Sequence, residues 1–320
     1  MRLFILIAAL CVLLDSGVSA AASDYPTRPV KVVVPYAPGG GLDVVGRPLL
    51  KKLGEALQQQ FILENRPGAG TTIGSAYVAR AAPDGYTLLL TLRALSISPS
   101  IYKNMTFDPE KDLEPISLVT RSGDILCVHP SVPARNLKQL IAYAQTHAGK
   151  LNYSSSGTGS DLHLTVAMFQ EIAGIKMTHI PFTGGGPGFT ALISGEVDAM
   201  LVPGSFGFPF IKAGKVRPLA VDEPSRSSTL PNVPTFKEEG FDGVSGSWSA
   251  LFAPKGTPRE IVMKLNAEVG KALENSEMRS FYLERFLVPL AGTPETLAEW
   301  LHNDISRWRK LVQNIEMVPQ

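Results

Sequence analysis

Cysteine is scarce in this 320-residue sequence, which contains only Cys11 and Cys127. Cys11 lies in an N-terminal segment that we expect to be removed, so the mature chain keeps Cys127 alone and has no internal disulfide. Cys127 belongs to the apolar run Ile125 to Val128, which favours a buried structural thiol over a reactive one. The fold must then be stabilised by its core, for which 44% hydrophobic residues are sufficient.

An excess of charge of either sign is also missing, because 30 Lys and Arg residues oppose 29 Asp and Glu residues. No basic run or basic-aromatic stripe occurs, so nucleic acid is not an expected partner. The five histidines are scattered, without an i, i+4 pair for a helical metal site. Neither Gly-x-Gly-x-x-Gly after the first strand nor Gly-Lys-Ser/Thr is present, which argues against dinucleotides and nucleoside triphosphates. The sequence predicts no cofactor and no metal.

The first 22 residues differ from the rest of the chain. Arg2 is followed by 12 consecutive apolar residues, Leu3 to Leu14, and then by small residues from Val18 to Ala22. This order is typical of a secretory signal peptide with its cleavage site. A membrane anchor is the alternative, but 12 helical residues reach only about 18 Å across a hydrocarbon layer of about 30 Å. We therefore expect residues 1–22 to be removed and the mature protein to be exported to the periplasm.

Short β-branched runs alternate along the mature chain with glycine-rich loops and segments of helical spacing. The first run, Val30 to Val34, precedes Gly39-Gly40-Gly41 and a helix expected to be capped near Asp43. This alternation is typical of βαβ units and predicts an α/β protein with mostly parallel sheets. The same pattern predicts further strands at 61–63, 86–90, 151–154, 177–180 and 199–202, and helices at 72–81, 137–145, 162–172, 189–193, 259–273 and 294–312.

Two domains are expected from a chain of this length. The first series of units ends near residue 122 with too few strands for a good core, and a second series begins there. We therefore expect the chain to return to the first domain after about residue 245. The predicted domains comprise residues 23–122 together with 246–320, and residues 123–245.

Three glycine-rich loops each stand between a strand and a helix: residues 39–41, 155–160 and 183–186. In a parallel sheet these loops lie at the carboxyl ends of the strands, where free N–H groups of helix N-termini favour an anion. Each loop alone could be no more than a tight connection. Together they predict a convergent anion-binding site.

Several motifs resemble a known family, the Bug-type periplasmic solute receptors of tripartite tricarboxylate transporters. The resemblance is carried by the segments Tyr25 to Gly40, Glu64 to Gly70, Ala82 to Leu88, Lys150 to Gly157 and Ala253 to Pro258. It covers nearly all of the chain between residues 25 and 312, with the motifs in matching order.

The resemblance implies a two-domain periplasmic-binding-protein fold of type II-like architecture, with two mostly parallel sheets, a hinge and a ligand cleft between them. It implies a monomeric receptor, not an enzyme, that closes on a small carboxylate and delivers it to a membrane permease. Loops from opposite domains would grip the ligand's carboxylate. Carried onto this sequence, the binding residues are Tyr36, Pro38, Gly39, Gly40, Ser155, Ser156, Gly157 and Thr158, with Thr183 and Gly184 behind them.

Two positions depart from the family's usual pattern. Val202 stands where many relatives have an aspartate, and this loss of an acid suggests a ligand without an essential amino group. Arg93 follows the strand predicted at 86–90, where a small polar residue is usual, and could clamp a second carboxylate. A surface or salt-bridged arginine is the alternative. Phe206 and its neighbours form either an apolar far wall of the pocket or part of the core, so the ligand could be a dicarboxylate, a tricarboxylate or an aromatic acid.

Two other functions remain open at the level of sequence. A secreted α/β hydrolase would use Ser155 or Ser156 as its nucleophile, although the Gly-x-Ser-x-Gly motif is missing. A receptor that signals through a membrane sensor, instead of feeding a permease, would use the same pocket.

Overall fold

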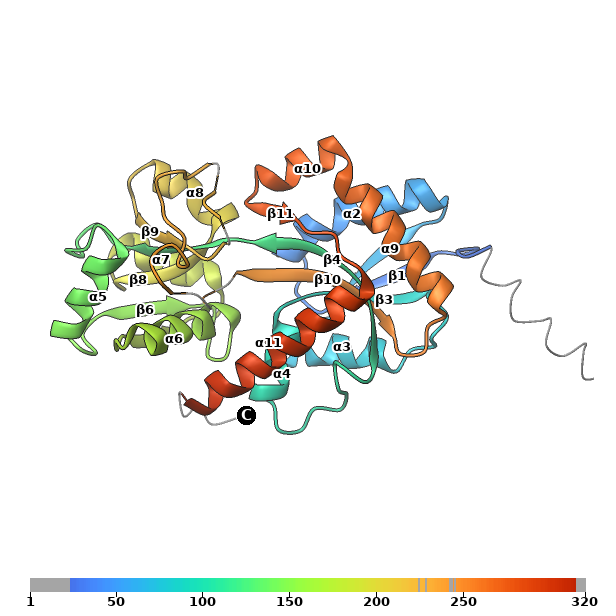
Figure 1. The fold of residues 1–320 in the computed structure, drawn as a ribbon, viewed down its shortest axis with the longest axis horizontal. Coiled ribbons are helices and arrows are strands. Elements are labelled where there is room, and N and C mark those ends of the chain that lie inside the picture. The colour runs from blue at the N-terminus through green and yellow to red at the C-terminus, as the bar shows by residue number, and fades with distance from the viewer. Residues whose placement is uncertain (1–23, 224, 228, 242–243, 245, 315–320) are drawn as a thin grey trace, which may run out of the picture.

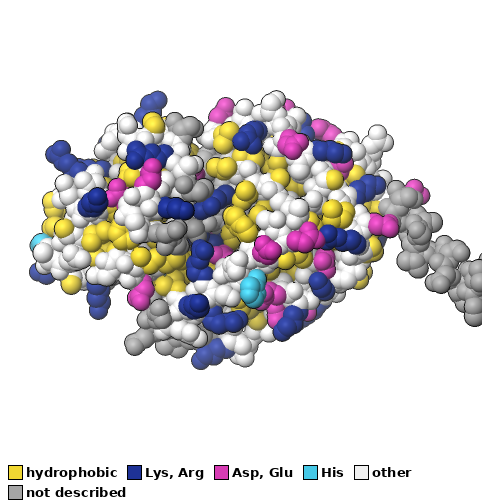
Figure 2. All heavy atoms as spheres, in the orientation of Figure 1, with side chains coloured by type: hydrophobic (Ala, Val, Ile, Leu, Met, Phe, Trp, Pro, Cys, Tyr) yellow, Lys and Arg dark blue, Asp and Glu magenta, His cyan; other side chains and the backbone are white. Residues whose placement is uncertain are grey.

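A computed structural model describes residues 24–314, apart from 224, 228, 242–243 and 245. The expected signal peptide lies outside the described residues. Two sheets form the centres of two α/β domains, which lie side by side (Figure 1). Within the described ranges no helix has the length and hydropathy needed to cross a membrane. Acidic and basic side chains are interspersed on the face shown in Figure 2, in keeping with the balanced composition.

The first domain is built on a six-stranded sheet in the order β11-β4-β10-β3-β1-β2. Its first strand explains the layering, because Val30, Val32 and Val34 pack into one core and Val33 into another. Helices α2, α9 and α10 cover the first of these faces, and α3, α4 and α11 cover the second. The strands are β1 Val30–Val34, β2 Phe61–Asn65, β3 Thr87–Leu92, β4 Leu113–Ser122, β10 Ser247–Pro254 and β11 Leu287–Pro289; the helices are α2 Gly41–Leu57, α3 Thr72–Ala79 with η1 Ala69–Thr71 before it, α4 Ala94–Ile101, α9 Arg259–Glu274, α10 Ser276–Leu283 and α11 Pro294–Asn314.

The second domain is built on a five-stranded sheet in the order β7-β6-β8-β5-β9. Its central strands are buried without a break, and Cys127 lies in β5 as a fully buried free thiol. Burial raises the pKa of this thiol, which keeps it protonated and unreactive. The strands are β5 Asp124–Val128, β6 Asn152–Ser155, β7 Thr178–Pro181, β8 Ala199–Pro203 and β9 Arg217–Val221; the helices are α5 Leu137–Thr146, α6 Asp161–Ala173, α7 Gly185–Ser194 and α8 Gly204–Lys212.

The sheets are mixed, so the expectation of mostly parallel sheets was wrong. β1 pairs in parallel with β2 and β3, but β10 runs antiparallel to β3 and β4. In the second sheet β5 runs antiparallel to both β8 and β9. The reason is the chain's path: β4 and β5 lead from one sheet into the other, and β10 leads back, so these strands oppose their neighbours.

At each crossing between the sheets, a glycine lies so close to another segment that a side chain would collide with it. A Cβ atom at Gly123 would lie 2.1 Å from the carboxylate of Glu223, and one at Gly246 would lie 2.3 Å from the carbonyl oxygen of Ser122. Only glycine lets the two crossing segments approach so closely. We propose that the domain boundaries lie at these crossings, at residues 122/123 and 245/246 as expected from the sequence.

A small apolar cluster joins the two domains away from the crossings. Ile97 and Ile101 of α4 and Trp308 of α11 pack with Leu164 and Met168 of α6. Figure 1 shows the C-terminal half of α11 reaching from the first domain towards α6. The tryptophan is therefore a core residue of an interdomain cluster.

Candidate functional site

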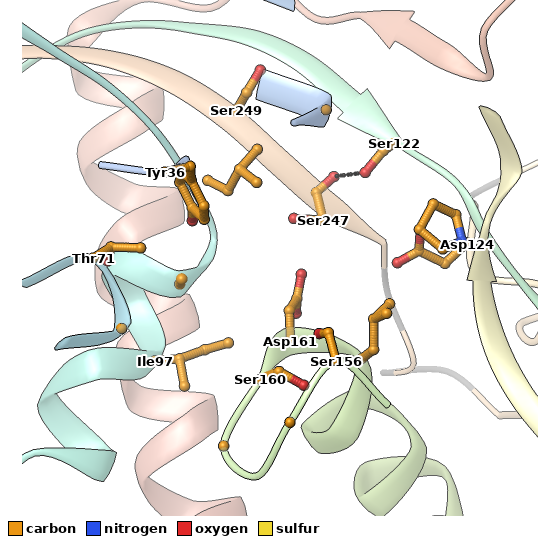
Figure 3. Close-up of a pocket in the computed structure, with 18 of the residues that line it drawn as sticks. Tyr36, Thr71, Ile97, Ser122, Asp124, Ser156, Ser160, Asp161, Ser247 and Ser249 are labelled. Carbon is orange, nitrogen blue, oxygen red and sulfur yellow. Dashed lines mark hydrogen bonds between the residues drawn. The ribbon is translucent and has the colours of Figure 1, made fainter. Parts of the chain in front are cut away.

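A cavity of about 800 Å³ lies between the two domains. The strands explain its position, since β1, β3, β6 and β8 all end with their carboxyl ends towards the junction of the sheets. In α/β sheets such ends are the usual place for ligands. The first domain contributes residues including Tyr36, Gly41, Thr71, Ala94, Ser247 and Arg285, and the second contributes Asp124, the loop from Ser156 to Ser160, Asp161 and Phe206 (Figure 3).

Three hydroxyl groups in the cavity wall form no hydrogen bond of good geometry to the described residues, although that of Tyr36 interacts weakly with the side chain of Thr91 and the backbone of Leu92. They belong to Tyr36, after β1, to Thr71, before α3, and to Ser247, at the start of β10. A buried hydroxyl without a partner costs about 1–3 kcal/mol. Such groups in a cavity are donors kept for a ligand.

The wall around Thr71 has an unusual backbone. Residues 68–71 all have positive φ angles, including +42° at Ala69 and +85° at Thr71, which are not glycines. A Cβ atom at Gly70 would lie 2.1 Å from the hydroxyl oxygen of Tyr102, another cavity residue. Strain of this kind is concentrated at ligand-binding sites, where the surrounding structure maintains it.

The opposite wall is a glycine loop that leads into α6. Ser160 caps this helix by accepting a hydrogen bond from the backbone N–H of His163. The Nδ1 atom of His163 in turn accepts a hydrogen bond of 3.1 Å from the backbone N–H of Gly159. His163 stacks on His179 with 3.9 Å between the ring centroids, and burial lowers the pKa of His163 to about 4. A neutral imidazole therefore holds the loop in place.

The charged groups of the lining are two acids and one base among the described residues. Asp161 is the first residue of α6, and Asp124 is the first residue of β5. Burial, followed by the nearby Asp222 and Asp161, raises the pKa of Asp124 well above its usual value. Arg285 lies near the rim, with 40% of its side chain exposed. The cavity therefore has polar ends and, between them, apolar walls that include Val44, Ile97, Ile101, Leu162 and Leu287.

Residues 45–317 match the model of a family described as the tripartite tricarboxylate transporter family receptor. The chain belongs to this family. A curated protein from the tcbD-tcbE intergenic region of a Pseudomonas species is 34% identical over 90% of this chain and 86% of its own length. BugT of Bordetella pertussis is 32% identical, with 93% of each chain covered.

Solved structures show the same fold. An R. palustris protein with adipate has a TM-score of 0.81 and 32% identity, covering 92% of this receptor and 100% of that chain. MatC from Rhodopseudomonas palustris with bound malate has a TM-score of 0.77 and 33% identity, covering 90% and 100%. The receptor is thus a two-domain solute-binding protein of a periplasmic family whose members are receptors and not enzymes.

Four of the binding residues expected from the sequence line the receptor's cavity: Tyr36, Ser156, Gly157 and Thr158. The other expected residues lie outside the lining formed by the described residues. Gly39 and Gly40 immediately precede the lining residue Gly41, and the N–H of Gly39 donates to Asp43. Asp43 therefore anchors the loop from inside α2 and is not the N-cap, which is Gly40. Pro38 belongs to the same loop, and Thr183 and Gly184 precede α7.

Ser155 is fully buried behind the cavity wall. Its hydroxyl oxygen lies 2.7 Å from Nε2 of His179 and bonds both the N–H and the carbonyl of Gly157. A serine paired with a histidine invites comparison with a hydrolase, but this side chain does not face the cavity. The pair instead fixes the loop, in agreement with a family of receptors.

Arg93 is completely buried and crosses from the first domain to the second. Its guanidinium donates to Oδ1 of Asp161 through Nε and Nη2, to Oγ1 of Thr165 at 2.8 Å and to the carbonyl oxygen of Gly246 at 3.0 Å. The group also lies 5.1 Å from the ring centroid of Trp308. Arg93 thus forms a salt bridge with an acid of the protein itself. This is the alternative to a clamp on a carboxylate of the ligand.

Val202 has no exposed surface and packs in the core of the second domain. A Cβ atom at Gly207, one turn into α8, would lie 2.7 Å from its side chain, so the surroundings of Val202 are tightly packed. The nature of residue 202 therefore says nothing about the ligand's amino group. Phe206 does line the cavity, whereas Phe208 and Phe210 pack against the core.

Sequence reasoning missed most of the polar residues of the cavity, among them Thr71, Asp124, Asp161 and Ser247. Asp161 directly follows the loop at 155–160 and, as the first residue of α6, continues the same wall. Thr71 directly follows the motif that ends at Gly70. For Asp124 and Ser247 the useful signal was their place next to the two predicted domain crossings, which lie beside the cleft.

Proposed function

We propose that this receptor captures a small carboxylate, such as a dicarboxylate, tricarboxylate or aromatic acid, between its two domains. The observation that carries the proposal is the pair of buried hydroxyls of Tyr36 and Thr71, which lie across the cavity from the glycine loop of Ser156 to Ser160. Hydroxyl donors and the backbone N–H groups of a glycine loop stabilise a carboxylate without a fixed cation. Relatives described with adipate and with malate support the ligand class.

We further propose that residues 1–22 direct export to the periplasm, and that the loaded receptor delivers its ligand to the membrane subunits of a tripartite tricarboxylate transporter. The family's description supports this partner. A receptor for a membrane sensor would bind the same ligand in the same cavity. Loss of uptake of the bound acid in a strain without the permease genes, with the receptor intact, distinguishes transport from sensing.

Calorimetric titration of residues 23–320 with adipate, malate, citrate and benzoate tests the ligand class. At a hundredfold excess over Kd, a true ligand stabilises the protein by about 2.7 kcal/mol, which also gives a clear thermal shift. Absence of binding by every carboxylate would contradict the proposal.

Tyr36→Phe tests the site. The lost hydrogen bond to a charged group should weaken binding about 10- to 100-fold. The stability of the free protein should fall by no more than about 1 kcal/mol, because the removed hydroxyl makes only weak interactions with Thr91 and Leu92. Ser75→Ala is the matched control, since Ser75 in α3 also has a buried unpartnered hydroxyl but lies outside the cavity lining. Equal affinities of Tyr36→Phe and the control would place the carboxylate elsewhere.

A further inference from the structure

One end of the cavity carries carboxylate acceptors, which a ligand's own carboxylate cannot use because it only accepts hydrogen bonds. Figure 3 shows Asp161 and Asp124 projecting into the same space from two elements of the second domain, with Ser247 of β10 on its far side. Ser122 also lines this end of the cavity. We name these four residues, Ser122, Asp124, Asp161 and Ser247, the acidic end.

Asp161 is only partly used by the protein. Both of its hydrogen bonds from Arg93 end on Oδ1, so Oδ2 is available on the cavity side. Its side chain keeps 21% exposure, while that of Arg93 has 1%. Arg93 therefore neutralises the charge of Asp161 from behind without covering its cavity face.

Asp124 has no side-chain hydrogen bond to any described residue, although only 3% of it is exposed. Its backbone N–H donates a hydrogen bond of 2.6 Å to Oδ1 of Asp222, which fixes the backbone of Asp124 but not its carboxyl group. Burial beside Asp222 and Asp161 raises the pKa of Asp124, and the charge of Arg93 offsets only part of this rise. A buried acid without a partner needs a cation or a proton.

Ser247 gives an independent sign that a ligand reaches this end. The residue is 6% exposed, lines the cavity and has a buried hydroxyl without a partner among the described residues. A protonated amine offers three donors and would meet Asp124, Oδ2 of Asp161 and Ser247 together.

We propose that the acidic end binds a protonated amine of the ligand, so that the receptor's solute is an aminocarboxylate. This inference rests on the proposed function, because the carboxylate would occupy the end formed by Tyr36 and Thr71. It replaces the sequence-based expectation of a ligand without an amino group, which depended on Val202, a residue of the core. Asp124 and Asp161 become the specificity-determining residues.

Matched pairs of probes that differ only in the amine test the inference: glutamate and glutarate, 2-aminoadipate and adipate, 6-aminohexanoate and hexanoate, phenylalanine and 3-phenylpropanoate. Calorimetric titration of residues 23–320 should show the amino member of at least one pair binding about 10- to 100-fold more tightly, as expected for hydrogen bonds between charged groups. Tighter binding of the amine-free member in every pair that binds would overturn the inference but leave a carboxylate receptor.

Asp124→Asn should reduce the preference for the amino member at least tenfold. It should fold, because the side chain of Asp124 bonds no described residue. Glu223→Gln is the matched control, since Glu223 is a buried acid near the same crossing but outside the cavity lining. An unchanged preference in Asp124→Asn would overturn the inference, as would an equal loss in Glu223→Gln. If no member of any pair binds the unchanged receptor or the Asp124→Asn variant, the proposed function fails together with this inference.

Discussion

Replacing Arg93 by methionine removes the guanidinium but keeps most of the apolar stem, and so isolates the ion pair between the domains. The side chain is fully buried and donates to Asp161 and Thr165 of α6 and to the carbonyl oxygen of Gly246. Asp161 and the carbonyl would lose these bonds in the variant. The substitution therefore tests how strongly one buried cation couples the two domains.

The magnitude follows from burial. Removing one partner of a buried ion pair costs about 3–5 kcal/mol, because the other charge is left uncompensated. Asp161 keeps 21% of its side chain exposed to the cavity, so water relieves part of this penalty. We expect Arg93→Met to lower the free energy of unfolding by about 2–4 kcal/mol and Tm by roughly 5–10 °C.

A double-mutant cycle in the ligand-free protein measures the pair itself. Arg93→Met and Asp161→Asn should each destabilise, and the double variant should recover about 1–3 kcal/mol relative to their sum. Arg28→Met is the surface control, because Arg28 and Asp84 form an ion pair with 62% and 44% of their side chains exposed. That pair is worth at most about 1 kcal/mol. Additivity of the cycle within about 0.5 kcal/mol, or equal effects of Arg93→Met and Arg28→Met, would refute the reasoning.

Two further predictions concern the binding loop and the crossings. His163 has a folded pKa of about 4, below the usual 6.5 of a histidine, so the unfolded chain takes up a proton first and stability falls as the pH drops from 6.5 towards 4. His163→Gln should remove up to about 3 kcal/mol of this acid-induced loss of stability. Denaturant titrations of both proteins near pH 7 and near pH 4.5 measure the difference. Equal loss of stability in both proteins would contradict the role of His163. Gly246→Ala should lower Tm, because the added Cβ would lie 2.3 Å from a backbone carbonyl oxygen that cannot move freely. Gly270→Ala, in α9 with no heavy atom within 4 Å, should raise stability by about 0.5–1 kcal/mol, so thermal unfolding of the two variants in the opposite order would count against this account.

The sequence predicted the elements whose patterns are local. β1 was placed correctly at Val30–Val34, and the helices at 259–273 and 294–312 match α9 and α11 within two residues. Helix α4 was missed because Ala94–Ile101 is buried and contains Pro99, so it lacks amphipathic spacing. Pro48 lies inside α2, where the packing of that helix on the first core outweighs the lost hydrogen bond.

The family of this receptor, its α/β character and the loops after β1 and β6 were determined by the sequence alone, because glycine-rich loops between strands and helices are local features. Strand direction was decided only by the tertiary structure, since the crossings bring β10 back against β3 and β4. The partner of Arg93 and the burial of Val202 were decided there too. A side chain's charge or size is local, but its partner comes from an element distant in the chain: Arg93 and Asp161 are 68 residues apart and meet only when the two domains pack together.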